Sequence, residues 1–402
     1  MPVPRALEPL RHRDFRLLWT GQTVSAVGNF IHGVALPFQI LALGGGALEL
    51  GLWGAIFSVA SLVFVLFGGA IADRFPRRAV ILVTDFTAGL VVAAVAMLAM
   101  TGQLRIEHLY VEAAIFGAAE SFFHPALSAL IPELVPPQIL QAGNALRGSS
   151  QQIALLAGPL IGGLLVAFAG PPLAFGVDAA TFFVSFAALA LARPPRREPP
   201  PAAPLLRQVR EGLRYTFSVP WLWIFIFAWA LVLFGQIGPL NVGMPIFVRD
   251  VLHGDARLFG LLTAAVGVGQ VVTGVALAQL KIRRLGIAIC VFGMSGGLAL
   301  AAVGLVPEMP VTLLFLAIFG AQFVGVGVLW TTAVQKHVPP AVMGRVMSID
   351  YFGGTLLLPI APIVFAALIT AVGTSQAFVI GGVMSAIIAA LLLLVPSIRA
   401  LE

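Results

Sequence analysis

Long apolar runs, separated by short polar or basic segments, make up most of the chain. Each run holds about 20 residues or more, the length that an α-helix needs to cross the hydrocarbon core of a bilayer. Barrel strands would instead alternate apolar and polar residues over about ten positions. The expected fold class is therefore an all-α polytopic membrane protein. Twelve transmembrane helices are predicted at residues 16–43, 48–72, 79–101, 108–132, 143–169, 172–192, 221–248, 257–280, 286–306, 311–335, 346–372 and 376–395.

A polar segment at residues 193–220 divides this pattern into two sets of six predicted helices. The sequence thus predicts an N-terminal six-helix half at 1–192, a cytoplasmic linker at 193–220 and a C-terminal six-helix half at 221–402. Inside the linker, LLRQVREGLRYTF alternates basic and apolar residues at helical spacing. This pattern predicts a helix near 202–217 that lies on the membrane surface.

The two halves share a weak internal repeat at an offset of 203 residues. The matching positions are Pro136 with Pro339, Pro137 with Pro340, Pro159 with Pro362, and Gly170 with Gly373. Several matches at one offset indicate a duplication. Parallel repeats of six helices are a known transporter architecture, so we expect two pseudo-symmetric halves.

Composition and charge narrow the class of protein. The chain is 59% hydrophobic and only 10% charged, and its mean hydropathy is +1.02, which argues against a soluble enzyme, a secreted scaffold or a disordered chain.

Of the 23 Lys and Arg residues, all but Arg105, Arg249 and Arg257 fall on the side that holds both termini and the linker. The positive-inside rule therefore predicts cytoplasmic termini, and topology explains the basic excess without a nucleic-acid partner. Cys290 stands alone, so no intramolecular disulfide can form.

The loop GGAIADRFPRR, between the second and third predicted helices, carries the most specific motif. It resembles the signature loop of the major facilitator superfamily at Gly69, Asp73, Arg74, Arg77 and Arg78. The resemblance implies the fold of that superfamily, and a conformational latch in which Asp73 meets the start of the eleventh helix near residues 344–348. The arginines would pair with Asp73 and hold the loop at the headgroups. The alternative is a basic loop that follows topology alone.

Further segments resemble one branch of bacterial efflux permeases, which holds macrolide-efflux and enterobactin-exporter-like proteins. The segments are DFRLLWTGQTVSAVGNF, FFHPALSALIPELVPP, AGNAL, GPLIGG and DAATFFVS. GPLIGG is similar to an antiporter motif of the fifth helix, although small residues also permit close helix packing. The arginine that many drug–proton antiporters carry in the fourth helix is missing from VEAAIFGAAES, so proton coupling does not follow from that motif. The resemblance implies a monomer in the bacterial inner membrane.

Glu120 is the sharpest candidate for a charge in the transport site. It lies near the middle of the fourth predicted helix, which has no basic residue, and His124 follows one turn later. Ionisable groups inside a membrane are costly and by default mark a pathway or a buried partner. The pair suits proton exchange or recognition of a cation, and the alternative is a structural hydrogen bond to a neighbouring helix. Glu112, two turns earlier, is expected near the outer end.

Other polar side chains outline a possible cavity. The first helix carries a stripe of Gln22, Ser25, Asn29, His32 and Gln39, too polar to face lipid. In the resembled fold, helices 1, 4, 7 and 10 line the cavity. That resemblance adds a set of residues from the seventh and tenth helices, with interhelical packing as the alternative for each: Gln236, Asn241, Gln322 and Trp330.

Three further acidic residues are expected to have structural roles. Asp85 and Asp350 lie within two turns of the cytoplasmic helix ends, and we expect them to meet arginines such as Arg77, Arg147 or Arg345. Asp178 lies about two turns from the outer end of the sixth helix. All three are therefore interpreted as partners in packing rather than in transport.

The sequence shows no phosphate-binding loop, metal-ligand spacing or nucleophile–base motif, so we expect no enzyme activity, cofactor or metal. The leading hypothesis is a secondary transporter that exports amphipathic or apolar small molecules, of the drug or siderophore class, by alternating access and in exchange for protons. The alternative is a lipid or lysolipid transporter on the same fold. A sensor or an enzyme subunit is disfavoured because no soluble domain is seen.

Overall fold

The computed structural model describes the backbone of residues 5–193 and 205–402, and the side chains of residues 7–64, 75–193, 210–340 and 342–402. Two compact units divide the chain. The first unit holds Met1–Pro200 together with Gly254–Ala264, and the second holds Pro201–His253 and Ala265–Glu402. The segment 254–264 begins the eighth predicted helix, yet it packs within the first unit rather than with the rest of the C-terminal half.

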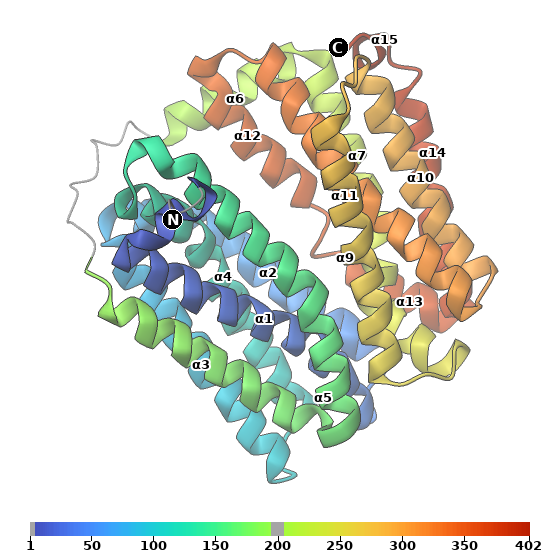
Figure 1. Ribbon diagram of the computed structural model, residues 1–402. Coiled ribbons are helices and arrows are strands. Elements are labelled where there is room, and N and C mark those ends of the chain that lie inside the picture. The colour runs from blue at the N-terminus through green and yellow to red at the C-terminus, as the bar shows by residue number, and fades with distance from the viewer. Residues whose placement is uncertain (1–4, 194–204) are drawn as a thin grey trace. The chain divides into compact units, whose positions relative to one another are not determined.

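The first unit is a bundle in which α5 lies along both α1 and α3, while α2 packs against α4 (Figure 1). At Gly170 the backbone of α5 takes φ 79° and ψ 166°, so α5 consists of two successive spans joined by a sharp turn. The helices of this unit are α1 (Arg13–Ala42), α2 (Ala47–Arg74), α3 (Arg77–Met100), α4 (Ile106–Leu134) and α5 (Leu140–Leu191), with short 3₁₀ turns at Arg5–Arg11 and Pro137–Ile139.

The second unit begins with α6 (Leu205–Ser218) and α7 (Pro220–Gly238). After α7 the chain continues through two π-helical turns, Pro239–Gly243 and Phe247–Val251, on either side of α8 (Met244–Ile246). Proline and glycine residues of the segment FGQIGPLNVGMP interrupt the regular backbone pattern here. The remaining helices are α9 (Ala256–Gln279), which starts in the first unit, α10 (Leu285–Leu305), α11 (Met309–His337), α12 (Pro340–Thr355), α13 (Ala361–Val372), α14 (Thr374–Leu392) and α15 (Pro396–Arg399).

The expected twelve spans are confirmed. Ten helical segments of the described chain are long and apolar enough to cross a bilayer, with α5 taken as one of them. Its turn at Gly170 adds an eleventh span. The one that remains, the eleventh in chain order, is divided between α12 and α13, which are too short individually and are separated by a run of turns.

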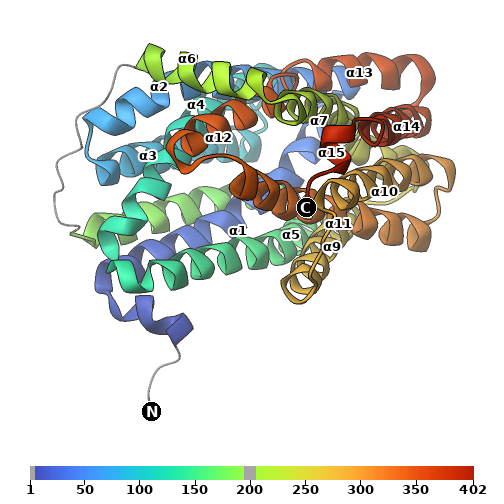
Figure 2. The same cartoon turned by 90° about the horizontal axis from the view of Figure 1, so that it is seen from above.

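The linker contains the expected helix, since α6 covers Leu205–Ser218. It lies beside α12 and α7 of the same unit (Figure 2). Arg345 of α12 donates a hydrogen bond to Glu211 of α6 at 2.6 Å, while Leu213 and Phe217 are exposed. The helix is therefore fixed to the second unit and keeps an apolar side uncovered.

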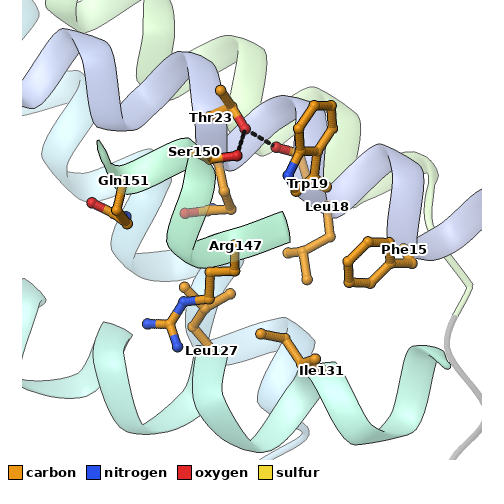
Figure 3. Close-up of a pocket in the computed structure, with 10 residues that line it drawn as sticks. Phe15, Leu18, Trp19, Thr23, Leu127, Ile131, Arg147, Ser150 and Gln151 are labelled. Carbon is orange, nitrogen blue, oxygen red and sulfur yellow. Dashed lines mark hydrogen bonds between the residues drawn. The ribbon is translucent and has the colours of Figure 1, made fainter. Parts of the chain in front are cut away.

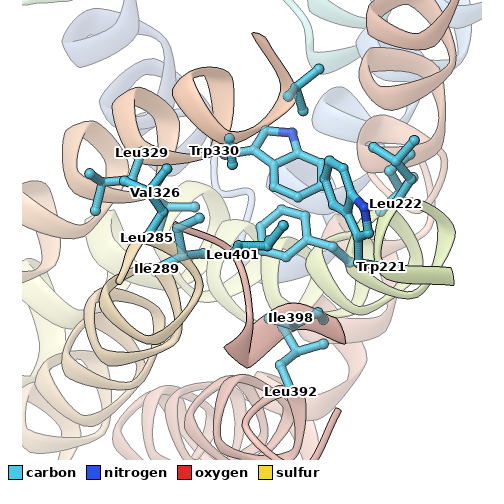
Figure 4. Packing of buried hydrophobic residues seen from close by; sticks show 14 of the residues in the cluster. Trp221, Leu222, Leu285, Ile289, Val326, Leu329, Trp330, Leu392, Ile398 and Leu401 are labelled. Atoms are coloured by element: carbon cyan, nitrogen blue, oxygen red, sulfur yellow. The ribbon is translucent and has the colours of Figure 1, made fainter. Parts of the chain in front are cut away.

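Aromatic side chains fill the core of the second unit (Figure 4). Trp330 of α11 stacks on Phe225 of α7 with ring centroids 3.8 Å apart, and Trp221 meets Trp330 edge to face. Ile289 and Leu392 add aliphatic surface from α10 and α14. Such contacts supply dispersion energy between helices, where the lipid removes most of the hydrophobic drive for association.

The backbone supports the internal repeat. Gly373, which joins α13 to α14, has φ 91° and ψ 163°, close to the φ 79° and ψ 166° of Gly170. This region of conformational space is open essentially to glycine alone. Two glycines 203 positions apart thus make the same turn between consecutive spans, as a duplication requires.

Candidate functional site

A cavity of about 360 Å³ opens in the first unit, bounded by α1, α2, α3, α4 and α5. Its wall is mostly apolar and aromatic, with a few polar groups. Four of the residues expected in the transport site share it, namely Asn29, His32, Glu120 and His124. Other lining residues are Gln22, Ser25, Gly33, Trp53, Phe57, Asp85, Phe116, Gln151 and Phe182.

Glu120 and His124 lie together on the wall of this cavity. The Oε1 atom of Glu120 is 3.2 Å from Nε2 of His124, one helical turn away. Their side chains are 40% and 53% exposed within the structure. The expected contact between the two is present, but the Glu120 carboxylate is open to the cavity rather than sealed in the protein.

Three buried titratable side chains, those of His32, Glu112 and Asp178, form a cluster. Nε2 of His32 lies 3.4 Å from Oε1 of Glu112, and Nδ1 lies 3.3 Å from Oδ2 of Asp178. The side chains of both acids are 0% exposed, and that of His32 is 5% exposed. Three helices, α1, α4 and α5, each contribute one member.

Aromatic and polar neighbours hold this cluster in place. The His32 ring stacks on Phe116 and meets Phe175 edge to face. Trp53 of α2 donates a 2.8 Å hydrogen bond to Oε2 of Glu112, and Thr181 lies 3.4 Å from Oδ1 of Asp178. The facing atoms of the cluster, both His32 ring nitrogens, Glu112 Oε1 and Asp178 Oδ2, are buried and have no hydrogen-bond partner of good geometry in the described part of the chain.

Asp85 forms a second buried polar group at the cavity wall. Its Oδ2 accepts a 2.7 Å hydrogen bond from Ser185 and lies 3.4 Å from the side-chain amide of Gln22. The expectation that Asp85 meets Arg77 or Arg147 is wrong, because Arg77 pairs with Glu133 instead. A hydroxyl and an amide thus satisfy this carboxylate without a cation, which the position of Asp85 near a helix end did not indicate.

The residues expected from helices 7 and 10 have different surroundings. Gln236 and Gln322 are fully buried and exchange two side-chain hydrogen bonds, of 3.0 and 2.8 Å. Trp330 is buried and donates to Asp350 at 3.1 Å, so Asp350 has a tryptophan partner where an arginine was expected. Asn241 is exposed. In the second unit, Gln236, Gln322 and Trp330 thus connect helices to one another.

The signature loop is described only in part. The side chains of Gly69, Asp73 and Arg74 lie outside the described residues, so the expected latch contacts stay predictions. Arg77 pairs with Glu133 of α4. Arg78 donates to the carbonyl oxygens of Leu189 and Ala190 at the end of α5, at 3.0 and 2.7 Å. These arginines link α3 to α4 and α5, a role that the motif alone did not suggest.

A narrower pocket, of about 20 Å³, lies between α1, α4 and α5 (Figure 3). Thr23 donates to Ser150 at 2.9 Å there, and Trp19 donates to the carbonyl of Leu146 at 3.2 Å. Arg147 extends toward Leu127 of α4 (Figure 3), and its buried Nε has no hydrogen-bond partner among the described residues. The volume suits a solvent molecule rather than an organic substrate.

Sequence reasoning identified His32 but missed its two acidic partners. Glu112 was expected near the outer end of its helix, and Asp178 was expected to be structural. The signal was present, since each is an acid inside an apolar run. Among the described residues, no group of three or more His, Cys, Asp or Glu side chains has an arrangement that could hold a metal ion.

Comparisons with known proteins agree with this architecture. A family model described as transmembrane secretion effector matches residues 5–402. The enterobactin exporter EntS of Citrobacter koseri is 26% identical over 340 residues, which cover 83% of this chain and 80% of that protein. The enterobactin exporter EntS of Shigella boydii is 27% identical over the same length and coverage.

Solved structures show the same fold at low sequence identity. A bacterial homologue of the iron transporter ferroportin, in an inward-facing state, superposes with a TM-score of 0.74 at 16% identity and covers 94% of this chain and 98% of that chain. A transporter of the POT family reaches a TM-score of 0.76 at 14% identity and covers 96% of each chain. The resemblance to the major facilitator fold is thereby confirmed.

These matches define the class of protein. A polytopic helical chain with exporter relatives is a protein of the bacterial inner membrane, with a small-molecule substrate. It is a transporter of the exporter type rather than an enzyme. The chain belongs to the transmembrane secretion effector family and has the fold of the major facilitator superfamily.

Proposed function

We propose that the protein exports amphipathic small molecules of the siderophore class by alternating access, in exchange for protons. The observation that carries the proposal is the cavity of about 360 Å³ in the first unit, with an aromatic wall and carboxylates at its surface. Apolar walls with a few placed polar groups are typical of sites that bind small organic molecules. The enterobactin exporters that resemble this chain support the substrate class.

The cavity offers two kinds of contact to such a molecule. Phe57, Phe116 and Phe182 present ring surface from three different helices, which suits stacking on aromatic groups. Glu120, His124 and Asn29 supply hydrogen-bond donors and acceptors beside them. Since no phosphate-binding loop occurs in the sequence, an ion gradient is the energy source we propose.

Filling the cavity tests the proposal. Gly33 lines the cavity, and nothing lies within 4 Å of a side-chain carbon added there. We expect Gly33→Leu to lower enterobactin uptake into inside-out vesicles with an acid interior by about tenfold, the equivalent of about 1.4 kcal/mol, because leucine occupies the substrate space without a backbone clash. The readout is uptake by wild type and variant, with and without a protonophore.

Gly327→Leu is the matched control. Gly327 also has nothing within 4 Å of its added carbon, but it belongs to α11 of the second unit and is not one of the residues that line this cavity. Enterobactin uptake by the Gly327→Leu variant should equal that of wild type. Equal uptake by the Gly33→Leu variant would remove the cavity from the substrate path, and a wild-type protein that moves no enterobactin would contradict the substrate class.

We also propose that both termini and the linker face the cytoplasm. The support is the distribution of Lys and Arg over the loops. In a Cys290→Ala background, we expect a membrane-impermeant thiol reagent to label Gln103→Cys in intact cells and to label Arg210→Cys only after the membrane is opened. Both positions are exposed. Labelling of Arg210→Cys in intact cells would reverse the topology.

A further inference from the structure

When His32, Glu112 and Asp178 are all ionised, their cluster carries a net negative charge, which one additional proton would neutralise. An imidazolium and two carboxylates sum to minus one. Leaving such a charge in an apolar environment is costly unless it is paired or hydrogen-bonded. One proton added to either acid makes the cluster neutral, with an imidazolium, one carboxylate and one carboxylic acid.

Among the residues whose side chains the structure describes, no Lys or Arg pairs with the cluster to supply that charge instead. The neighbours of the cluster are the neutral Trp53 from α2 and Thr181 from α5. The titratable groups that share the cavity are Asp85 of α3, with Glu120 and His124 further along α4. Among the described side chains, no Lys or Arg forms an ion pair with any of the three.

The contacts inside the cluster are loose for a purely structural ion pair. Charge-assisted hydrogen bonds between nitrogen and a carboxylate measure about 2.7–2.9 Å, whereas the two His32 contacts are 3.4 and 3.3 Å. Asp85, in comparison, has a 2.7 Å hydrogen bond from Ser185. Buried polar atoms without partners are uncommon in folded proteins and require a specific explanation.

His32 connects the cluster to the cavity. It lines the cavity wall, while Glu112 and Asp178 lie behind it and do not. Each of its ring nitrogens faces one of the two acids, and both nitrogens are themselves buried. The imidazole can therefore pass a proton from one acid to the other, and water from the cavity must reach the cluster before a proton leaves it.

We propose that His32, Glu112 and Asp178 form the site that binds the coupling proton, and that Glu120 and His124 contact substrate. This inference rests on the proton-driven export proposed above. In the loaded state one acid holds the proton as its O–H. On release, that proton passes to water that enters from the cavity, and the cluster returns to an imidazolium and two carboxylates.

Transport by matched variants tests the assignment. Glu112→Gln and Asp178→Asn preserve size but cannot ionise. We expect both to exchange enterobactin across vesicles without a gradient within about twofold of wild type, and to lose the stimulation by an acid interior, so that the ratio of uptake with and without the gradient falls to about one. Glu120→Gln should keep the stimulation and raise the KM for enterobactin.

An infrared titration of the purified full-length protein gives a second readout, independent of transport. The wild type and Glu120→Gln should show the infrared band of a protonated carboxyl group. Glu112→Gln and Asp178→Asn should lack it. This measurement also decides the matter if one variant fails to fold, since the wild type and the other variant remain.

Two outcomes would overturn the inference. One is loss of the gradient effect in Glu120→Gln while Glu112→Gln and Asp178→Asn keep it. The other is a carboxyl band that persists in both cluster variants. A wild type that transports no enterobactin under a gradient would instead contradict the proposed function, and the infrared band would still decide whether the cluster holds a proton.

Discussion

Gly297→Ala should destabilise the second unit, because α10 and α14 touch at this residue. A side-chain carbon at Gly297 would lie 2.5 Å from the backbone nitrogen of Ala386 and 2.7 Å from the carbonyl oxygen of Gly382. Backbone atoms cannot turn aside as a flexible side chain can, so the helices must separate. We expect the free energy of unfolding in detergent to fall by about 1–3 kcal/mol, the usual range for overpacking.

Gly327→Ala, in the same unit, should leave the stability of the protein unchanged or raise it. Nothing lies within 4 Å of the carbon added there, and alanine is the better helix former by about 1 kcal/mol. Its unfolding midpoint should stay equal to that of wild type or rise. If both variants shift equally, the close approach at Gly297 does not stabilise the unit.

Replacing Gln236 or Gln322 alone should cost more than replacing both. The two amides exchange hydrogen bonds of 3.0 and 2.8 Å in a site with no exposure. Gln322→Met leaves the Gln236 amide buried and unpaired, which costs about 1–3 kcal/mol. The double variant Gln236→Met/Gln322→Met removes both polar groups and should unfold close to wild type.

A double-mutant cycle measures this coupling, by chemical unfolding of the four proteins. Enterobactin uptake by the double variant separates the two interpretations of these residues. Retained uptake would assign the amides to packing between α7 and α11. A stable double variant without uptake would return them to the substrate site that the sequence-based hypothesis placed there.

The spans could be predicted from the sequence because the bilayer imposes their length and polarity. Runs of about 20 apolar residues suffice to find them, and Gly170 and Gly373 stood out through the repeat. The division of the eleventh span into α12 and α13, and the π-helical turns after α7, depend on local backbone geometry that an apolar run does not encode.

The partners of buried charges were harder to predict. Asp85 was expected to find an arginine because basic residues are close in sequence, but a hydroxyl and an amide from α5 and α1 satisfy it. His32, Glu112 and Asp178 come from three helices far apart in the chain. The polar stripe of α1 indicated that His32 faces inward, but the apolar runs around Glu112 and Asp178 left the rotation of α4 and α5 about their axes undetermined.

In the second half of the repeat, the positions that correspond to the His32 cluster hold residues without ionisable side chains. At the offset of 203, His32 corresponds to Gly235, Glu112 to Phe315 and Asp178 to Gly381. A carbon added at Gly235 would lie 2.8 Å from the Gly381 carbonyl oxygen, so in the second unit the matching helices meet backbone to backbone. In the second half, Gly235 and Gly381 allow two helices to approach closely. In the first half, the corresponding positions hold His32 and Asp178, beside Glu112. At these three positions the two halves thus differ in chemistry, ionisable in the first and neutral in the second, so the buried charge of the His32 cluster belongs to one half of the repeat alone.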